Sequence, residues 1–209
     1  VIASIFGGTK EEFGFVASKI SEAKPPLIEV NLSCPNTGKD FGLPFALGAP
    51  DAMQVIEIVK NSTKIPVIAK LAPNVPDIKE IAKAVADAGA DAISAINTMP
   101  GMMIDVKTVK PILHNKEGGV SGPALKPIAV KCIYDICEAV DIPIIGIGGV
   151  TYGADAIEMM MAGASAVQIG TAINYRGIKV FKKVSAEIEE FMKENGYNKL
   201  KDIIGIAHS

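Results

Sequence analysis

The stretch that decides the predicted fold is Ile144-Ile145-Gly146-Ile147-Gly148-Gly149, an apolar run that ends in two glycines. A second apolar run, 166–169, ends in a similar way, at Gly170-Thr171. Glycines at the end of a strand let the backbone approach an anion and offer N–H groups to it. In (β/α)8 barrels, the loops after strands seven and eight frequently build a phosphate site. We therefore predict that these runs are the last two strands of such a barrel, and that Gly148, Gly149, Gly170 and Thr171 bind a phosphate.

Apolar runs alternate with helical patterns six times along the chain, which indicates a parallel sheet covered by helices. The strands are predicted at 1–6, 27–30, 67–71, 92–96, 144–147 and 166–169. The helices are predicted at 9–23, from 50 onward, and at 77–89, 127–140, 153–162 and 177–195. Because the strand runs are continuously apolar, both faces of the sheet should be buried.

The fold class predicted from this order is α/β, a (β/α)8 TIM barrel of which the chain supplies six βα units, strands three to eight. The chain begins at Val1, inside the first strand run and without a Met. We therefore expect residues 1–209 to form a single barrel domain that lacks an upstream segment with two more strands.

Two alternatives stay open at the level of residue pattern. A doubly wound sheet would place its phosphate glycines after the first strand, in the spacing G-x-G-x-x-G, which Gly7-Gly8 does not supply. The glycines after the last two strands are also compatible with tight turns alone. The longest non-helical connection, 99–126, contains two short runs, 105–107 and 110–113, that are predicted to pair as an accessory hairpin.

The composition and charge of the chain argue against several classes of function. The 209 residues are 49% hydrophobic and 21% charged, and the net charge of −2 does not suggest a nucleic-acid surface. Every apolar run is far shorter than the about 20 residues that a membrane span needs, and no secretory leader pattern is seen. Cys34, Cys132 and Cys137 lack disulfide-scaffold spacing, which favours a reducing cytoplasm. No metal site is expected, because Cys132 and Cys137 have no partner ligands nearby in sequence.

One cysteine stands where a predicted strand becomes a loop, in the stretch Val30-Asn31-Leu32-Ser33-Cys34-Pro35-Asn36. Pro35 biases Cys34 toward an extended conformation, and Asn31 and Asn36 flank the thiol with carboxamides. The loop that follows, 37–48, is long and glycine-rich, as a mobile lid over a site would be. An inert cysteine at a strand end fits the residue types equally well, because most cysteines are inert.

Six segments resemble those of the class 1 dihydroorotate dehydrogenases, in that family's order. They are NLSCPN (31–36), IAKLAPN (68–74), INT (96–98), GGVSGPA (118–124), GIGGV (146–150) and IGTA (169–172). Together they span almost the whole chain. The resemblance implies a barrel with FMN over its mouth, and oxidation of (S)-dihydroorotate to orotate in de novo pyrimidine (UMP) synthesis.

The resemblance also assigns the reacting groups. Cys34 would be the general base that takes the proton from carbon 5 of the substrate, while a hydride leaves carbon 6 for FMN. Lys70, the one charged residue of its strand, would lie against the flavin ring, where positive charge favours the anionic reduced form. The alternative for Lys70 is a side chain at the rim of the strand that extends to solvent.

Further contacts follow from the same resemblance. Asn31 would contact both flavin and substrate, and Ile96 and Gly122 would contact the flavin through backbone groups. Ser4 departs from the family, which commonly has an Asn in the corresponding strand. The other expected substrate ligands are Asn36, Asn97 and Thr98. His114 and His208 show no partner pattern and are predicted to be surface residues.

The subclass is predicted from two features. Cys rather than Ser at position 34 resembles the soluble enzymes, and Phe41-Gly42 together with the pattern 97–105, NTxxGMxID, resembles class 1B. This subclass implies an FMN-binding homodimer core within a heterotetramer. The partner subunit would carry FAD and an iron–sulfur cluster and pass electrons to NAD⁺, since no cluster-binding Cys run occurs in this chain.

Two rival functions remain. The first is a metal-free barrel lyase or isomerase that acts on a phosphorylated sugar, with Lys70 forming a Schiff base. The second is a non-catalytic fragment, because six strands cannot close an eight-stranded barrel.

Overall fold

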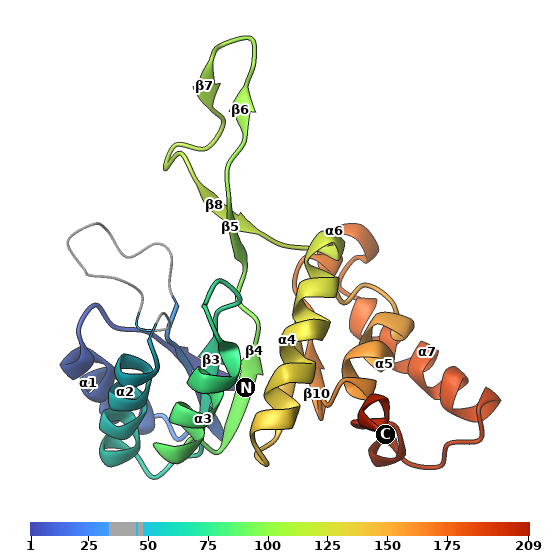
Figure 1. Cartoon of the computed structure of the whole chain (residues 1–209), viewed down its shortest axis with the longest axis horizontal. Coiled ribbons are helices and arrows are strands. Elements are labelled where there is room, and N and C mark those ends of the chain that lie inside the picture. Colours follow the sequence, from blue (N-terminus) through green and yellow to red (C-terminus); the bar gives the residue numbers. More distant parts are fainter. Residues whose placement is uncertain (34–44, 46–47) are drawn as a thin grey trace.

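The computed structural model describes residues 1–33, 45 and 48–209 (Figure 1). Its centre is a six-stranded sheet in the order β1-β2-β3-β4-β9-β10, and every neighbouring pair is parallel. The strands are β1 (Ile2–Ile5), β2 (Leu27–Asn31), β3 (Val67–Leu71), β4 (Ala92–Ala95), β9 (Ile144–Ile147) and β10 (Ala166–Gln168). The six predicted strands are confirmed to within one residue at either end, which is the usual uncertainty at strand ends. The sheet curls into part of a barrel, so the α/β class is also confirmed.

A layer of helices covers one face of the sheet (Figure 1). Successive helices from α1 to α5 are neighbours, and α7 lies beside α5. The helices are α1 (Lys10–Ser21), α2 (Ala49–Ser62), α3 (Ile78–Asp87), α4 (Lys126–Ala139), α5 (Gly153–Met161), α6 (Ala172–Arg176) and α7 (Val180–Glu194). Short 3-10 turns lie at Pro123–Leu125, Leu200–Asp202 and Ile206–His208. The helices described in the structure are too short or too polar to cross a membrane.

Two helix starts follow from capping residues. The Thr9 hydroxyl accepts a hydrogen bond from the backbone N–H of Glu12 at 3.2 Å, and the Glu12 carboxylate accepts one from Gly8 N at 2.7 Å. Asp77 caps α3 by accepting from Lys79 N at 2.8 Å. The last predicted helix is confirmed except at its start: it begins at Val180 and not near Gly177, because Gly177, with a φ of +71°, separates it from the short α6.

The hydrophobic core lies between the sheet and the helices. The largest fully buried side chains there include Phe13, Ile28, Ile56, Ile93 and Ile133. Each such side chain contributes roughly 1.5–3 kcal/mol through its removal from water. The glycine inside β9 serves this packing: a Cβ at Gly146 would lie 2.9 Å from Ile133 Cδ1 and 3.0 Å from Met159 Sδ. Gly146 therefore lets α4 and α5 approach β9 closely.

A two-part arm leaves the barrel after β4 and extends away from the sheet (Figure 1). Its base is β5 (Met99–Gly101) paired antiparallel with β8 (Gly118–Val120), and its tip is β6 (Ile104–Asp105) paired with β7 (Lys110–Pro111). The predicted accessory hairpin between 105–107 and 110–113 is therefore confirmed in outline, with its pairing centred on 104–105 and 110–111.

Candidate functional site

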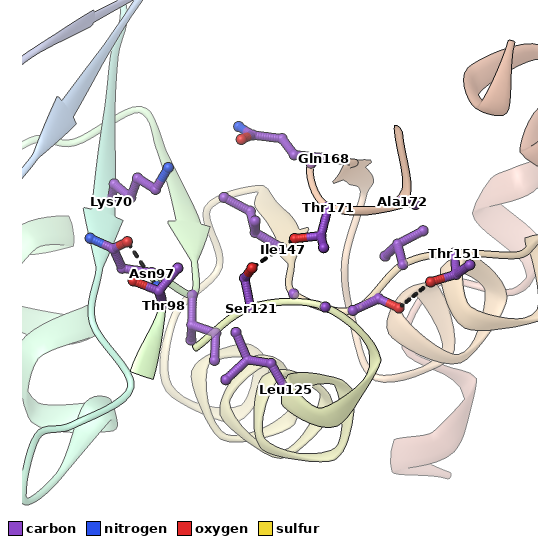
Figure 2. Close-up of a pocket in the computed structure, with 16 residues that line it drawn as sticks. Lys70, Asn97, Thr98, Ser121, Leu125, Ile147, Thr151, Gln168, Thr171 and Ala172 are labelled. Atoms are coloured by element: carbon purple, nitrogen blue, oxygen red, sulfur yellow. Dashed lines mark hydrogen bonds between the residues drawn. The ribbon is translucent and has the colours of Figure 1, made fainter. Parts of the chain in front are cut away.

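A cavity of about 280 Å³ opens at the edge of the sheet where the parallel strands end. It is lined by the ends of β3 and β10, the residues after β4 and β9, and the segment that leads into α4. The lining residues are Lys70, Ile96, Asn97, Thr98, Ser121, Gly122, Leu125, Ile147, Gly148, Gly149, Val150, Thr151, Gln168, Gly170, Thr171 and Ala172. Figure 2 shows Lys70, Asn97 and Thr98 on one side, with Gln168 and Thr171 across from them. Nine residues predicted from the sequence thus line one cavity: Lys70, Ile96, Asn97, Thr98, Gly122, Gly148, Gly149, Gly170 and Thr171.

Three of the cavity glycines adopt backbone conformations that other residues rarely take. Gly122, Gly148 and Gly149 have φ angles of +89°, +128° and +77°. A Cβ at Gly149 would lie 2.9 Å from Lys126 N and 3.0 Å from Gly122 O, so the loop after β9 rests directly on the start of α4. A Cβ at Gly170 would meet nothing within 4 Å, so close packing does not require a glycine there.

The loop after β9 is fastened by Asp155, in the first turn of α5. Its carboxylate accepts hydrogen bonds from Thr151 N at 2.9 Å and Tyr152 N at 2.8 Å, and it pairs with Lys126 Nζ at 2.8 Å. Burial raises the pKa of Asp155, but the hydrogen bonds from Lys126 and the two N–H groups outweigh it and leave the pKa below its usual value. The hydrogen bond to Asp155, and a second one to Glu158, raise the pKa of Lys126.

Lys70 does not extend to solvent from the rim of its strand. Its Nζ lies 3.4 Å from Glu29 Oε1 in β2, and its side chain is 20% exposed. The other carboxylate oxygen of Glu29 accepts hydrogen bonds from Ser94 Oγ at 3.0 Å and Gln168 Nε2 at 2.9 Å. Glu29 was not predicted as a site residue, although its position inside an apolar run was the same signal that singled out Lys70.

Asn97 ties the end of β4 to the end of β2. Its Nδ2 donates to Ser33 O at 2.8 Å and Ser33 Oγ at 2.7 Å, and it approaches Asn31 Oδ1 at 3.4 Å. Its Oδ1 accepts from Thr98 N at 2.8 Å. The predicted residues Asn31 and Asn97 therefore do meet, although Asn31 does not itself line the cavity. Ser33 was not predicted.

On the opposite side, Thr171 joins two segments that line the cavity. Its Oγ1 donates to Ser121 Oγ at 2.8 Å, which links the loop after β10 to the segment before α4 (Figure 2). A Cβ at Gly122 would lie 3.3 Å from Thr171 Cγ2. Ser121 is a further cavity residue that was not predicted.

Some predictions lie outside the described residues. These are Cys34 and Asn36, the predicted lid over 37–48 apart from Phe45 and Gly48, and the subclass feature Phe41-Gly42. They stay predictions.

The other two cysteines are free thiols on α4. Burial raises the pKa of Cys132 to about 11 and also raises that of Cys137, so both thiols are protonated at neutral pH. Among the described residues, no group of three or more His, Cys, Asp or Glu side chains is arranged to hold a metal ion.

Three other predicted positions have clear outcomes. Ser4 is exposed in β1, next to Glu29 of β2 in the strand register. His114 is exposed on the arm, as predicted. His208 was wrongly predicted as a surface residue: it is half-buried and stacks on Tyr134, with ring centroids 3.8 Å apart.

Comparison with known proteins gives consistent results. The family model described as dihydroorotate dehydrogenase matches residues 1–192. The catalytic subunit of dihydroorotate dehydrogenase B (NAD(+)) from Pyrococcus abyssi is 50% identical over 207 residues, which are 99% of this chain and 69% of that protein. The subunit of the same name from Methanocaldococcus jannaschii is 51% identical over 208 residues, or 100% of this chain and 67% of that protein.

A solved structure supports the fold independently. The crystal structure of the Eimeria tenella enzyme titled DHODH in complex with ferulenol superposes with a TM-score of 0.80 at 24% identity. The match covers 95% of this chain and 58% of that one, and at this identity it concerns the fold alone.

Proposed function

The chain belongs to the dihydroorotate dehydrogenase family, a family of oxidoreductases, and from this premise we propose that it carries the FMN-binding site of a class 1B enzyme. The reaction is the oxidation of (S)-dihydroorotate to orotate in pyrimidine synthesis. Family membership argues against the rival phosphosugar lyase. The observation that carries the proposal is the single cavity that brings Lys70, Asn97 and the glycines after β9 and β10 together.

The cavity suits FMN at both of its ends. At one end, Gly148, Gly149, Gly170 and Thr171 follow β9 and β10, and backbone N–H groups at such positions bind phosphate. A Cβ at Gly149 would lie 2.9 Å from Lys126 N, so a glycine lets this loop rest on the start of α4 in the position in which it lines the cavity. At the other end, Lys70 offers an ammonium group to a flavin ring. FMN, when bound, supplies the acceptor for the hydride that leaves carbon 6 of the substrate.

The chain's own residues supply binding and proton transfer. In the proposed reaction, Cys34 takes the proton from carbon 5 of the substrate. The electron pair of the broken carbon–hydrogen bond then forms the double bond between carbons 5 and 6. A free thiol has a pKa near 8.5 and is mostly protonated at neutral pH, so the rate should rise as thiolate forms. Asn31, Asn36, Asn97 and Thr98 bind the substrate's polar groups, because each offers hydrogen-bond donors and acceptors. Ile96 and Gly122 contact the flavin through backbone groups.

A separate subunit completes the electron path in this proposal. The relatives are named catalytic subunits of an NAD(+) enzyme, a name that implies a second subunit. We propose that this partner carries FAD and an iron–sulfur cluster, and that the two form a cytoplasmic heterotetramer around a homodimer of the FMN subunit.

The test is an anaerobic assay of the whole FMN protein, alone and mixed with its partner. Alone, it should bind FMN and lose the flavin's visible absorbance when dihydroorotate is added, but it should not reduce NAD⁺. Addition of the partner should restore NAD⁺ reduction. A protein that binds no FMN, or whose FMN is not reduced by dihydroorotate, would contradict the proposed reaction. Efficient NAD⁺ reduction by the FMN protein alone would contradict the subclass.

A further inference from the structure

The parallel sheet contains one ion pair. Its six strands hold two charged residues, Glu29 in β2 and Lys70 in β3. The two are paired, with Lys70 Nζ 3.4 Å from Glu29 Oε1, and their side chains are 20% and 6% exposed. Glu29 is thus a buried carboxylate that the proposed reaction does not use.

Glu29 is held from three other strands. Ser94 in β4 and Gln168 in β10 both donate to its Oε2, at 3.0 and 2.9 Å, and Lys70 in β3 approaches its Oε1. With Oε2 engaged in this way, Oε1 is directed at the lysine. The orientation of the carboxylate is therefore set by the barrel and not by the lysine alone.

Stability does not by itself account for this arrangement. A buried ion pair costs a large desolvation free energy, and well-packed apolar side chains in its place are often as stable or more so. Lys70 and Gln168 line the cavity and Glu29 does not. Glu29 therefore acts on the cavity through the two lining residues that it contacts, and of these Lys70 is the one that carries a charge.

We propose that Glu29 is a positioning residue whose carboxylate holds the Lys70 ammonium at the wall of the cavity, in the place where it meets the flavin. The inference rests on the proposed function, since it concerns the same cavity. Without Glu29, the long Lys70 side chain would populate several rotamers and extend toward the solvent at the opening of the cavity.

The first experiment does not depend on catalysis: it measures how readily the Lys70 amine is methylated, which reports how firmly the amine is held. The whole protein, stripped of flavin, is treated with formaldehyde and a mild hydride donor, and methylation of each lysine is followed by mass spectrometry. Glu29→Gln should raise the methylation rate of Lys70 about tenfold or more, because the amine is no longer held against a buried carboxylate. Lys126, which is paired with Asp155 and Glu158, is an internal reference whose rate should not change.

The matched control is Ser94→Ala. This change removes one hydrogen bond to the same carboxylate, at a site as buried as Glu29, but leaves both charges in place. It should alter the methylation rate of Lys70 by less than about twofold. A wild-type rate at Lys70 in the Glu29→Gln protein would overturn the proposal, and so would an equal rise at Lys70 and Lys126, which would indicate general loosening of the fold.

The second experiment is a double-mutant cycle on the holoenzyme. In the wild-type background, Glu29→Gln should slow flavin reduction by dihydroorotate about tenfold, with a much smaller change in the KM for dihydroorotate. In a Lys70→Met background, the same change should have an effect of less than about twofold, because the residue through which Glu29 acts is gone. Equal effects in both backgrounds would overturn the proposal. Because methylation is read without flavin or substrate, the positioning role and the proposed function can fail separately.

Discussion

Replacement of Gly149 by Ala is the sharpest test of the proposed phosphate end of the cavity. Gly149 has a φ of +77°, and an added Cβ would lie 2.7 Å from Lys126 Cβ, 2.9 Å from Lys126 N and 3.0 Å from Gly122 O. Two of these atoms belong to the backbone, so a change of side-chain rotamer cannot relieve the contact. The left-handed conformation costs about 1–2 kcal/mol and overpacking about 1–3 kcal/mol, which gives about 2–5 kcal/mol together.

This cost can appear in either of two measured quantities, the free energy of unfolding or the affinity for FMN. Either the folded state keeps its geometry and becomes less stable, or the loop after β9 moves off the start of α4 and no longer presents its N–H groups to a phosphate. A loss of about 2 kcal/mol in binding corresponds to about a thirtyfold higher Kd for FMN. Chemical denaturation of the flavin-free protein measures the first effect, and titration with FMN, followed by the quenching of its fluorescence, measures the second.

Gly196→Ala is the matched control. Gly196 has a φ of +74° at the end of α7, but a Cβ there would meet nothing within 4 Å. It therefore incurs the conformational cost without the steric one, and FMN binding should be unchanged. A Gly149→Ala protein whose unfolding free energy falls no more than that of Gly196→Ala, and which binds FMN as tightly as the wild type, would refute the steric role of Gly149.

Two further predictions concern the same end of the barrel and the proposed base. Asp155→Asn should lower the free energy of unfolding by about 1–2 kcal/mol at pH 7, because a charged acceptor for Thr151 N and Tyr152 N is lost. Since the pKa of Asp155 in the folded protein lies below its usual value of 3.8, its contribution is present above that value and lost as the pH falls below it. Denaturation curves of the two proteins should therefore converge below about pH 4, and a constant difference down to the lowest pH would contradict this origin. Cys34→Ser should leave FMN binding intact but slow flavin reduction by orders of magnitude at neutral pH, with partial recovery as the pH rises, and an unchanged rate would rule out Cys34 as the base.

Local sequence signals were sufficient to predict the order of elements. Thr9 and Asp77 accept hydrogen bonds from backbone N–H groups at the starts of α1 and α3, as capping residues should. Gly148 and Gly149 follow a buried strand and both have positive φ. Because glycine adopts positive φ readily, the residue type at these positions already predicted a turn. Such features depend on neighbours within a few residues, which is why a single sequence reveals them.

Contacts between distant strands were not predictable in the same way. Gln168 and Glu29 are 139 residues apart and meet because the sheet curls β10 toward β2. The sequence marked Lys70 as a charge in need of a partner, but the identity of that partner depends on register. The register pairs Lys70 with Asn31 and Ser94 and leaves Glu29 two residues away along β2. Asn97 is similar: its type suggested a ligand contact, whereas its Nδ2 also holds Ser33 at the end of β2.

Two backbone N–H groups of the loop after β9 are already engaged within the protein. Thr151 N and Tyr152 N donate to Asp155, so the carboxylate already occupies the place at the start of α5 where an anion would otherwise bind. A phosphate bound by this loop would therefore take its contacts from the earlier part, Gly148 and Gly149, which faces Gly170 and Thr171 across the cavity. The same carboxylate also pairs with Lys126 on α4, which keeps that lysine engaged beside the glycines. The proposed phosphate site thus depends on Asp155 without including it, and this predicts that Asp155→Asn should affect FMN binding less than Gly149→Ala.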